Sequence, residues 1–379
     1  MLLAFGLKNF FSFKEGVDIS FRLGANVPKS ISQGKDFAPV LCFKGANGAG
    51  KTHLIRGVSF LTDFCTKSFS WDPEANILVE NYYRNGMDSE FYVEFYHDKA
   101  EYRYELTVNR THVVREVIYR TLKKKTRLIE RVGNEIVYAT KPLEELKKLR
   151  LRKNVSIISL ANQYQSPGLE SVYKFFSLIA TNVNWAGLRD QWVTIENAAA
   201  LMKEQPTFLK FAADFIRKCD IGISNILIHE IEDKEGDKTP FPIFVHKVGG
   251  KDEAVIDEFE SSGTKALFRF LGIYKLMLDT GGVLALDEFD INLHPHILPK
   301  LVNLFLDPKI NKNDAQLLFT THDGKILDLL GKYRTYLVAK EDNESFAYRL
   351  DEVGGDIIRN DRPLFPVYDE GKIGGVPRL

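Results

Sequence analysis

A glycine-rich stretch near the N-terminus constrains the fold of this chain more than any other feature. Residues 45–52 read Gly-Ala-Asn-Gly-Ala-Gly-Lys-Thr, which fits the pattern G-x-x-x-x-G-K-[ST] of a phosphate-binding loop (P-loop). Glycine permits positive φ and a close approach of the backbone, so loop N–H groups and the following helix N-terminus can surround an anion. The residues expected to bind ATP here are Asn47, Gly48, Gly50, Lys51 and Thr52. In this pattern Lys51 reaches the β- and γ-phosphates, and the Thr52 hydroxyl binds Mg²⁺.

The segments on either side of the P-loop have the expected character. The apolar run at residues 37–43 predicts a buried strand, and residues 52–62 predict a helix with apolar residues at helical spacing. Strand, loop and helix in this order are the setting that the motif requires. The structural alternative, a glycine-rich turn that happens to precede a lysine, does not account for this setting.

A second motif lies far downstream. Residues 283–288 read Val-Leu-Ala-Leu-Asp-Glu, and a run that is apolar on both faces is typical of a buried parallel strand. Its carboxylates would emerge at the C-terminal end, where α/β sheets bind ligands. We expect Asp287 to hold Mg²⁺ beside Thr52, and Glu288 to act as general base for the attacking water. The alternative is a buried strand that merely ends in an acidic turn.

Two further segments fit the same kind of site. Residues 316–320 form an apolar run shortly before His322, and a histidine there can hydrogen-bond a γ-phosphate oxygen, although a structural histidine is the alternative. Ser261 and Gly263 precede a helix expected at residues 265–278, where N–H groups can face an anion. A simple N-cap would explain this serine equally well, so local physics leaves both interpretations open.

The remaining pattern predicts an α/β fold, a P-loop NTPase with an antiparallel β layer and a helical insertion. A chain of 379 residues exceeds a single core, and we expect lobes at residues 1–140 and 221–379 with an insertion at 141–220. β-like segments predict the antiparallel layer: 90–97, 101–108, 113–122 and 126–138. Helix-like segments predict the insertion: 143–152, 169–180, 194–202 and 206–219.

The overall charge does not indicate a partner, but the local distribution of charge does. The chain holds 51 basic and 51 acidic residues, but residues 110–153 carry fourteen Lys or Arg against five Glu. This basic region is either a solvated face or a binding surface for nucleic acid or an acidic partner. Three scattered cysteines and the lack of a long apolar segment predict a cytoplasmic protein without disulfides, structural zinc or membrane spans.

The order of these motifs resembles that of the ABC-type ATPase heads of the RecF and SMC group. Within that group the chain looks most like the stand-alone ATPases related to the OLD proteins, such as the RloA and AriA types. Matching segments are Asn-Phe-Phe-Ser-Phe-Lys at 9–14, a Walker B strand plus D-loop at 287–295, and the stretches 336–340 and 374–377. Residues 260–264, Glu-Ser-Ser-Gly-Thr, depart from the usual Leu-Ser-Gly-Gly-Gln signature but keep its serine and second glycine.

The resemblance implies a homodimer in which each ATP lies between Lys51 of one subunit and Ser261 and Gly263 of the other. It also implies a Q-loop glutamine after a strand. Residues 156–163 form a strand-like run, and Gln163 at its end is the candidate.

The function that follows is an ATP-binding and hydrolysing switch. Only 57 residues follow His322, too few for the Toprim nuclease domain of OLD proteins, so we expect any cutting to be done by a separately encoded effector. In the resembling families that effector is Toprim-like and the role is defence against phage. One alternative is a DNA-repair ATPase of the RecF or SMC kind that acts directly on DNA, supported by the basic region. Another is a small-molecule kinase, in which case the segments around Ser261 and His322 would be accidental.

Overall fold

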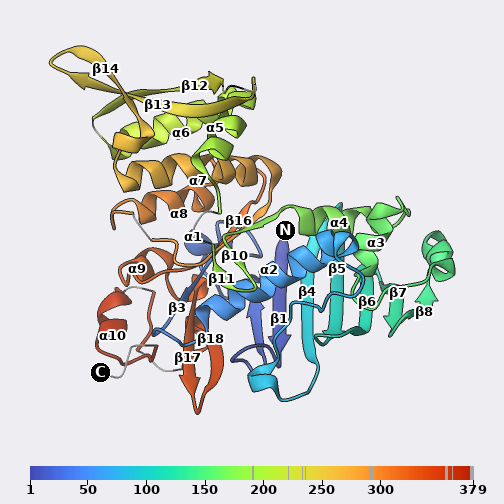
Figure 1. Ribbon diagram of the computed structural model, residues 1–379. Coiled ribbons are helices and arrows are strands. Elements are labelled where there is room, and N and C mark those ends of the chain that lie inside the picture. The colour runs from blue at the N-terminus through green and yellow to red at the C-terminus, as the bar shows by residue number, and fades with distance from the viewer. Residues whose placement is uncertain are drawn as a thin grey trace. The chain divides into compact units, whose positions relative to one another are not determined.

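The computed structural model describes residues 1–189, 192–220, 222–232, 234, 236–290, 293–354, 357–360 and 362–375 (Figure 1). The chain forms two compact units. Unit 1 comprises Met1–Leu188, Gly281–Phe289 and Asp314–Leu379, and unit 2 comprises Arg189–Thr280 and Asp290–Asn313. The expected insertion at 141–220 is therefore divided between the two units. Among the described residues, no helix is long and apolar enough to cross a membrane.

A parallel sheet forms the centre of unit 1. Its strand order is β18-β17-β3-β16-β15-β9, and all neighbours are parallel except the hairpin of β17 and β18. The strands are β3 (Val40–Lys44), β9 (Ile179–Thr181), β15 (Val283–Leu286), β16 (Gln316–Thr320), β17 (Thr335–Glu341) and β18 (Glu344–Arg349). Every residue of β3, β15 and β16 is buried, as expected of strands covered on both faces.

An antiparallel sheet of seven strands completes unit 1, in the order β2-β1-β4-β5-β6-β7-β8. Its strands are β1 (Leu2–Lys8), β2 (Val17–Ser20), β4 (Ser89–His97), β5 (Ala100–Val108), β6 (Val113–Thr121), β7 (Lys125–Val132) and β8 (Glu135–Ala139). Along β5 the even alternation of buried and half-exposed residues gives the sheet one apolar and one polar face. The expected antiparallel layer is thus confirmed.

Helices cover the apolar face of this sheet. They are α2 (Lys51–Lys67), α3 (Ile157–Gln163) and α4 (Glu170–Ser177), and α2 crosses β1 and β4 in Figure 1. Gly57 permits this close packing, since a Cβ there would lie 2.6 Å from Leu7 Cδ2. At α4, the Phe175 ring stacks on Phe95 with 3.9 Å between the ring centroids.

The remaining elements of unit 1 are short. They are the helices α1 (Lys29–Ser32), α9 (Ile326–Leu330) and α10 (Phe365–Asp369), the strands β10 (Val183–Asn184) and β11 (Gly187–Leu188), and five 3₁₀ segments at Ser68–Ser70, Tyr82–Arg84, Lys141–Lys148, Lys332–Arg334 and Leu350–Glu352. A small apolar cluster joins α9 and α10 to β17.

In its described residues, unit 2 packs four helices and a small antiparallel sheet. The helices are α5 (Ile195–Glu204), α6 (Pro206–Cys219), α7 (Ser262–Thr280) and α8 (Leu298–Leu306), and Asp257–Phe259 is a 3₁₀ segment. The sheet order is β12 (Ile223–Glu232), β13 (Lys238–Val248) and β14 (Lys251–Ile256). Phe268 of α7 meets Phe244 of β13 edge to face, with 5.7 Å between the centroids.

Three sequence-based assignments differ from the structure. The strand-like run at 156–163 is helix α3, because the Ser156 side chain caps its N-terminus by accepting a bond from the Ile158 N–H, and buried residues on every side hide the helical period. The helix expected at 169–180 ends at Ser177, and β9 follows it. The helix expected at 143–152 is a 3₁₀ segment, Lys141–Lys148.

Candidate active site

Four segments that are far apart in sequence meet at one edge of the parallel sheet. In the register, Phe43 lies opposite Thr320, Phe319 opposite Leu286, and Ala285 opposite Thr181. Parallel strands in register end together, so the P-loop after β3 lies beside the residues that follow β16, β15 and β9. This edge is where α/β sheets bind ligands.

The P-loop has left-handed backbone, which favours glycine, at two positions. Gly50 has φ 112° and is the N-cap of α2, and Gly48 has φ 74°. At Gly45, a Cβ would lie 2.1 Å from the Val338 carbonyl oxygen, so the loop runs directly against β17. Helix α2 has seventeen residues and no acidic residue of its own in its first turn.

Lys51 is a buried cation in this loop. Its side chain is 7% exposed, and Nζ donates hydrogen bonds to the carbonyl oxygens of Gly45 at 2.8 Å and Ala46 at 3.0 Å. Burial lowers the pKa of the Lys51 ammonium below its ordinary value, while the charge of Asp287 opposes this effect. Neutral carbonyl groups do not balance the charge, so the site favours an anionic ligand such as a phosphate group.

Asp287 and Thr52 lie together, as a shared metal site requires. Thr52 Oγ1 donates to Asp287 Oδ2 at 2.7 Å, and Thr320 Oγ1 donates to Asp287 Oδ1 at 2.6 Å. One hydroxyl and one carboxylate are oxygen ligands that suit Mg²⁺, which takes its other ligands from water and from substrate phosphates. Within the described ranges, no cluster of three or more His, Cys, Asp or Glu side chains could hold a metal by itself. The residues therefore fit Mg²⁺ bound together with a nucleotide, and they do not form a stand-alone metal site.

Glu288 has an unusual backbone conformation. Its φ is 48°, a left-handed value that is uncommon for residues other than glycine. Two bonds to β16 hold it there, since Thr320 Oγ1 accepts from the Glu288 N–H at 2.8 Å and the Thr320 carbonyl accepts from the Phe289 N–H at 3.0 Å. Strain of this kind persists where surrounding contacts enforce it, and it is frequent at active sites.

His322 lies at the same edge, after β16, and its side chain is exposed. Lys44, at the end of β3, is 4% exposed and donates from Nζ to the carbonyl oxygens of Thr321 and His322. This contact fixes the backbone at His322 beside the P-loop strand. The role of His322 as a γ-phosphate sensor stays a prediction.

The structure does not place Gln163 at this edge. Gln163 ends α3, whose Ser159 Oγ accepts from the Phe69 N–H at 3.0 Å, just beyond the C-terminus of α2. The P-loop lies at the other end of α2, and seventeen residues of α-helix span about 25 Å. Gln163 is therefore wrong as a residue of this site, because the run that carries it is a helix packed at the far end of α2.

Asn182 also lies at this edge of the sheet, although the sequence did not predict it as a site residue. It follows β9, the strand next to β15, and it bonds twice to Asp287: Asn182 Oδ1 accepts from the Asp287 N–H and Nδ2 donates to the Asp287 carbonyl, both at 2.8 Å. The signal was weak because β9 has only three residues and follows a helix.

Ser261 and Gly263 belong to unit 2. Ser261 Oγ accepts from the Thr264 N–H at 3.1 Å, so the serine caps α7, and Thr264 Oγ1 donates to Asp220 Oδ2 at 3.0 Å. Glu260 bonds to the His246 ring. The N-cap expected as one alternative is thus present, and binding of a second subunit's ATP stays a prediction. Ile291 and Asn292 of the expected D-loop, and Val376 and Pro377 of the C-terminal stretch, lie outside the described residues.

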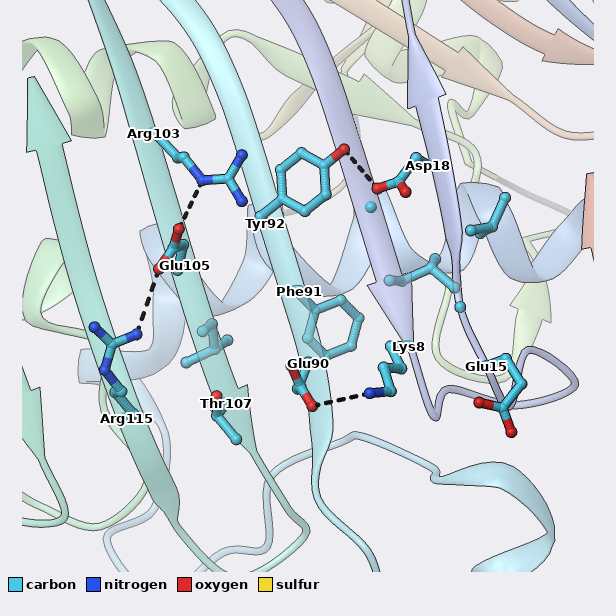
Figure 2. Close-up of a pocket in the computed structure, with 15 residues that line it drawn as sticks. Lys8, Glu15, Asp18, Glu90, Phe91, Tyr92, Arg103, Glu105, Thr107 and Arg115 are labelled. Carbon is cyan, nitrogen blue, oxygen red and sulfur yellow. Dashed lines mark hydrogen bonds and ion pairs between the residues drawn. The ribbon is translucent and has the colours of Figure 1, made fainter. Parts of the chain in front are cut away.

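A depression lies on the polar face of the antiparallel sheet, and each basic residue that lines it contacts a carboxylate (Figure 2). Lys8 lies 3.7 Å from Glu90, and Glu105 contacts both Arg103 at 2.6 Å and Arg115 at 3.3 Å. This depression therefore lacks the net positive charge that a phosphate ligand needs.

Much of the basic region is also paired within the fold. Arg131 and Glu116 are both fully buried with 3.6 Å between Nη1 and Oε2, and Arg115 and Arg127 both contact Glu130. Other pairs join Lys147 to Glu144, Lys148 to Glu145 and Lys153 to Glu74. In the part of the chain that the structure describes, the β6–β7 hairpin tip, Lys123–Lys125, has no ion pair, and neither have Arg120, Lys141 and Arg150, so the unpaired basic surface is smaller than residues 110–153.

His53 follows Thr52 and makes folding sensitive to acid. The pKa of His53 is lowered from 6.5 to about 4. Burial is the largest cause, and the charges of Arg56 and Lys340 add to it. The unfolded chain therefore binds more protons than the folded one between these values, and stability present above pH 6.5 is lost as the pH falls toward 4.

We expect the free energy of unfolding to fall by about 1–2 kcal/mol between pH 6.5 and 4.5 through His53 alone, after allowance for partial exposure. Urea unfolding of the wild type and of His53→Gln over this range measures the effect, with the exposed His112→Gln as control. The assignment is wrong if all three proteins lose the same stability.

Most of this chain matches a known protein family. Residues 40–328, more than half of the chain, match the family described as "AAA domain, putative AbiEii toxin, Type IV TA system". No curated protein matches the chain. Solved structures similar to it include the SmcHead bound to the C-winged helix domain of ScpA, with 13% identity, a TM-score of 0.48, and coverage of 93% of this chain and 99% of that one.

Two further SMC heads are similar at the same low level. The SMC head domain from Thermotoga maritima has 14% identity, a TM-score of 0.45, and coverage of 92% and 98%. The Smc head domain with an extended coiled coil, bound to the C-terminal domain of ScpA derived from Pyrococcus furiosus, has 12% identity, a TM-score of 0.43, and coverage of 93% and 97%. The family match covers more than half of the chain, and the P-loop lies at the edge of a parallel sheet, so the chain is an α/β protein with a P-loop domain and belongs to the AAA domain family described above.

Proposed function

We propose that this protein binds and hydrolyses ATP at the P-loop edge of unit 1, and that ATP closes a homodimer which controls a separately encoded effector. The observation that carries the proposal is the contact of Thr52 with Asp287 at 2.7 Å beside the buried cation Lys51. Thr52 and Asp287 lie 235 positions apart in sequence. Together with Lys51 they supply what a Mg²⁺-bound triphosphate needs.

The residues of this chain have separate tasks in the proposed reaction. The N–H groups of the P-loop and the Lys51 ammonium bind the phosphates, while Thr52 and Asp287 would hold Mg²⁺, which neutralises charge on the phosphate oxygens. Glu288 accepts a proton from the attacking water, and His322 bonds to a γ-phosphate oxygen. Asn182 fixes the backbone of Asp287 from both sides.

Dimerisation around ATP is proposed from the signature-like segment in unit 2. Ser261 Oγ and the first N–H groups of α7 form a helix N-terminus that can accept the γ-phosphate of a second subunit's ATP. We expect Glu288→Gln with ATP to elute as a dimer on size exclusion, and the same protein with Ser261→Arg to elute as a monomer with ATP still bound. A dimer that survives Ser261→Arg would contradict this arrangement.

Control of an effector, which we propose to be a Toprim-like nuclease in anti-phage defence, is the finer part of the proposal. It rests on the resemblance to RloA- and AriA-type ATPases. An affinity pull-down from the native host, with ATP, with ADP and with Lys51→Ala, tests it. We expect a nuclease subunit whose retention depends on ATP. Equal recovery in all three samples would show that partner binding does not depend on the nucleotide.

A DNA-repair ATPase acting directly on DNA is the second candidate, and one observation favours it. Lys123 and Lys124 at the β6–β7 hairpin tip are exposed, and, among described residues, no ion pair involves them. A salt-dependent gel shift of duplex DNA that Lys123→Glu/Lys124→Glu removes would support this candidate. If duplex DNA does not bind at low salt, the hairpin tip instead faces solvent or contacts an acidic protein.

A further inference from the structure

Three distant segments meet behind the P-loop through two buried serines. Ser345, in β18, is 2% exposed, and Ser12, in the N-terminal loop, is 5% exposed. Ser345 Oγ lies 2.7 Å from Ser12 Oγ and donates to the carbonyl oxygen of Ala49 at 2.7 Å. The Ser12 carbonyl also accepts from the Ser345 N–H at 2.7 Å, which fixes the two serines to each other.

The same pair of hydroxyls lies directly against Gly50. A Cβ at Gly50 would lie 2.7 Å from Ser345 Oγ and 3.0 Å from Ser12 Oγ. Gly50 is thus held between the serines on one side and the interior of the loop on the other. The tip of the β17–β18 hairpin has left-handed Asp342 and Asn343, with φ of 48° and 66°, and this tight turn places Ser345 at the loop.

His53 completes the chain of contacts. Its Nδ1 lies 2.7 Å from Ser12 Oγ, and its ring stacks on Phe11 with 4.7 Å between the centroids. Each hydroxyl has a single proton. One consistent arrangement satisfies all three contacts: His53 Nδ1–H donates to Ser12, Ser12 donates to Ser345, and Ser345 donates to Ala49. This arrangement requires a proton on Nδ1 of His53.

We propose that Ser12 and Ser345 are positioning residues that hold the P-loop in its ATP-binding shape by fixing the Ala49–Gly50 peptide. In a planar trans peptide the C=O and the following N–H point in opposite directions. Because Ser345 binds the Ala49 carbonyl, the Gly50 N–H is directed away from the serines and is available to a phosphate group. Without the bond this peptide can rotate, and the fraction of molecules ready to bind ATP falls.

The inference rests on the proposed binding of ATP at this loop, and its test compares three serine-to-alanine variants of the full-length protein. Ser345→Ala and Ser12→Ala remove the tie. Ser59→Ala is the matched control, because Ser59 is also 2% exposed and its Oγ also donates to a backbone carbonyl, that of Val183, at 2.7 Å. Ser59 lies in the middle of α2, away from the loop. The measured quantities are Kd for Mg-ATP, kcat for phosphate release, and Tm.

We expect Ser345→Ala to weaken ATP binding roughly three- to tenfold with kcat unchanged, the loss expected for one hydrogen bond. Ser59→Ala should lower Tm by a similar amount and leave Kd at the wild-type value. Because the serines act through one peptide, Ser12→Ala/Ser345→Ala should bind ATP about as well as Ser345→Ala alone.

Two results would overturn the inference: equal Kd values in Ser345→Ala, Ser12→Ala and Ser59→Ala, or losses of Ser12→Ala and Ser345→Ala that multiply in the double variant. Ser12→Ala tests the same tie if Ser345→Ala does not fold. A wild-type protein that fails to bind Mg-ATP would instead overturn the proposed function itself, and the two failures are therefore distinguishable.

Discussion

Replacing Glu288 by glutamine is expected to lower kcat for ATP hydrolysis about 100-fold or more, with ATP binding retained. Glutamine has the same size and keeps the N–H that donates to Thr320 Oγ1 at 2.8 Å, so the strained turn after β15 is preserved. An amide cannot accept the proton of the attacking water, and only the chemical step is lost. Phosphate release under saturating ATP measures kcat, and isothermal titration measures ATP binding.

The control for this variant is Glu135→Gln. Glu135 is an exposed residue of β8 in the same unit, so this variant makes the same chemical change far from the sheet edge. It should hydrolyse ATP at the wild-type rate. Wild-type hydrolysis by Glu288→Gln would remove Glu288 from the mechanism, and a loss of ATP binding in that variant would make its role structural.

Replacing Lys51 by alanine is expected to weaken ATP binding about 100-fold, because charge-assisted bonds to two phosphate groups are lost. The free energy of unfolding should not decrease. Burial lowers the pKa of Lys51, which means that the fold disfavours the charge until an anion arrives. We therefore expect Lys51→Ala to keep or slightly raise the free energy of unfolding while Kd for Mg-ATP rises.

Helix α2 provides a matched control, since Lys51 and Lys67 are its first and last residues. Lys67 is exposed and pairs with Asp63 at 2.6 Å. Lys67→Ala should bind ATP like the wild type and unfold within about 0.5 kcal/mol of it. Equal ATP affinity in Lys51→Ala and the wild type would refute the phosphate site. Unfolding of Lys51→Ala would show that the lysine is structural.

The local elements of the nucleotide site were predictable from the sequence. The P-loop glycines, the helix that begins at Lys51 and the apolar strand before Asp287 depend on residue types at fixed spacings, and short-range sterics and burial determine their conformation. The strand-like run before Gln163 misled for the opposite reason. Its residues are buried on every side, so they carry no period that separates helix from strand.

A count of charges in the sequence overestimates the unpaired positive charge of the basic region. Residues 110–153 have a surplus of nine positive charges, yet Arg131 is buried against Glu116, and Arg115 contacts Glu130, both across the β6–β7 pair. Partners on neighbouring strands are set by sheet register, which a charge count does not contain.

The sequence by itself determined that this chain has a phosphate-binding loop, an acidic strand end and an α/β fold with an antiparallel layer. Only the tertiary structure decided that Asn182 rather than Gln163 lies beside Asp287, and that Ser12 meets Ser345 across 333 positions behind the P-loop. The physical reason is that a motif is stabilised by bonds within a few residues, whereas these contacts exist only because parallel strands end at one edge and a hairpin turns back onto the loop. No local pattern encodes which distant residue such a sheet edge brings into contact.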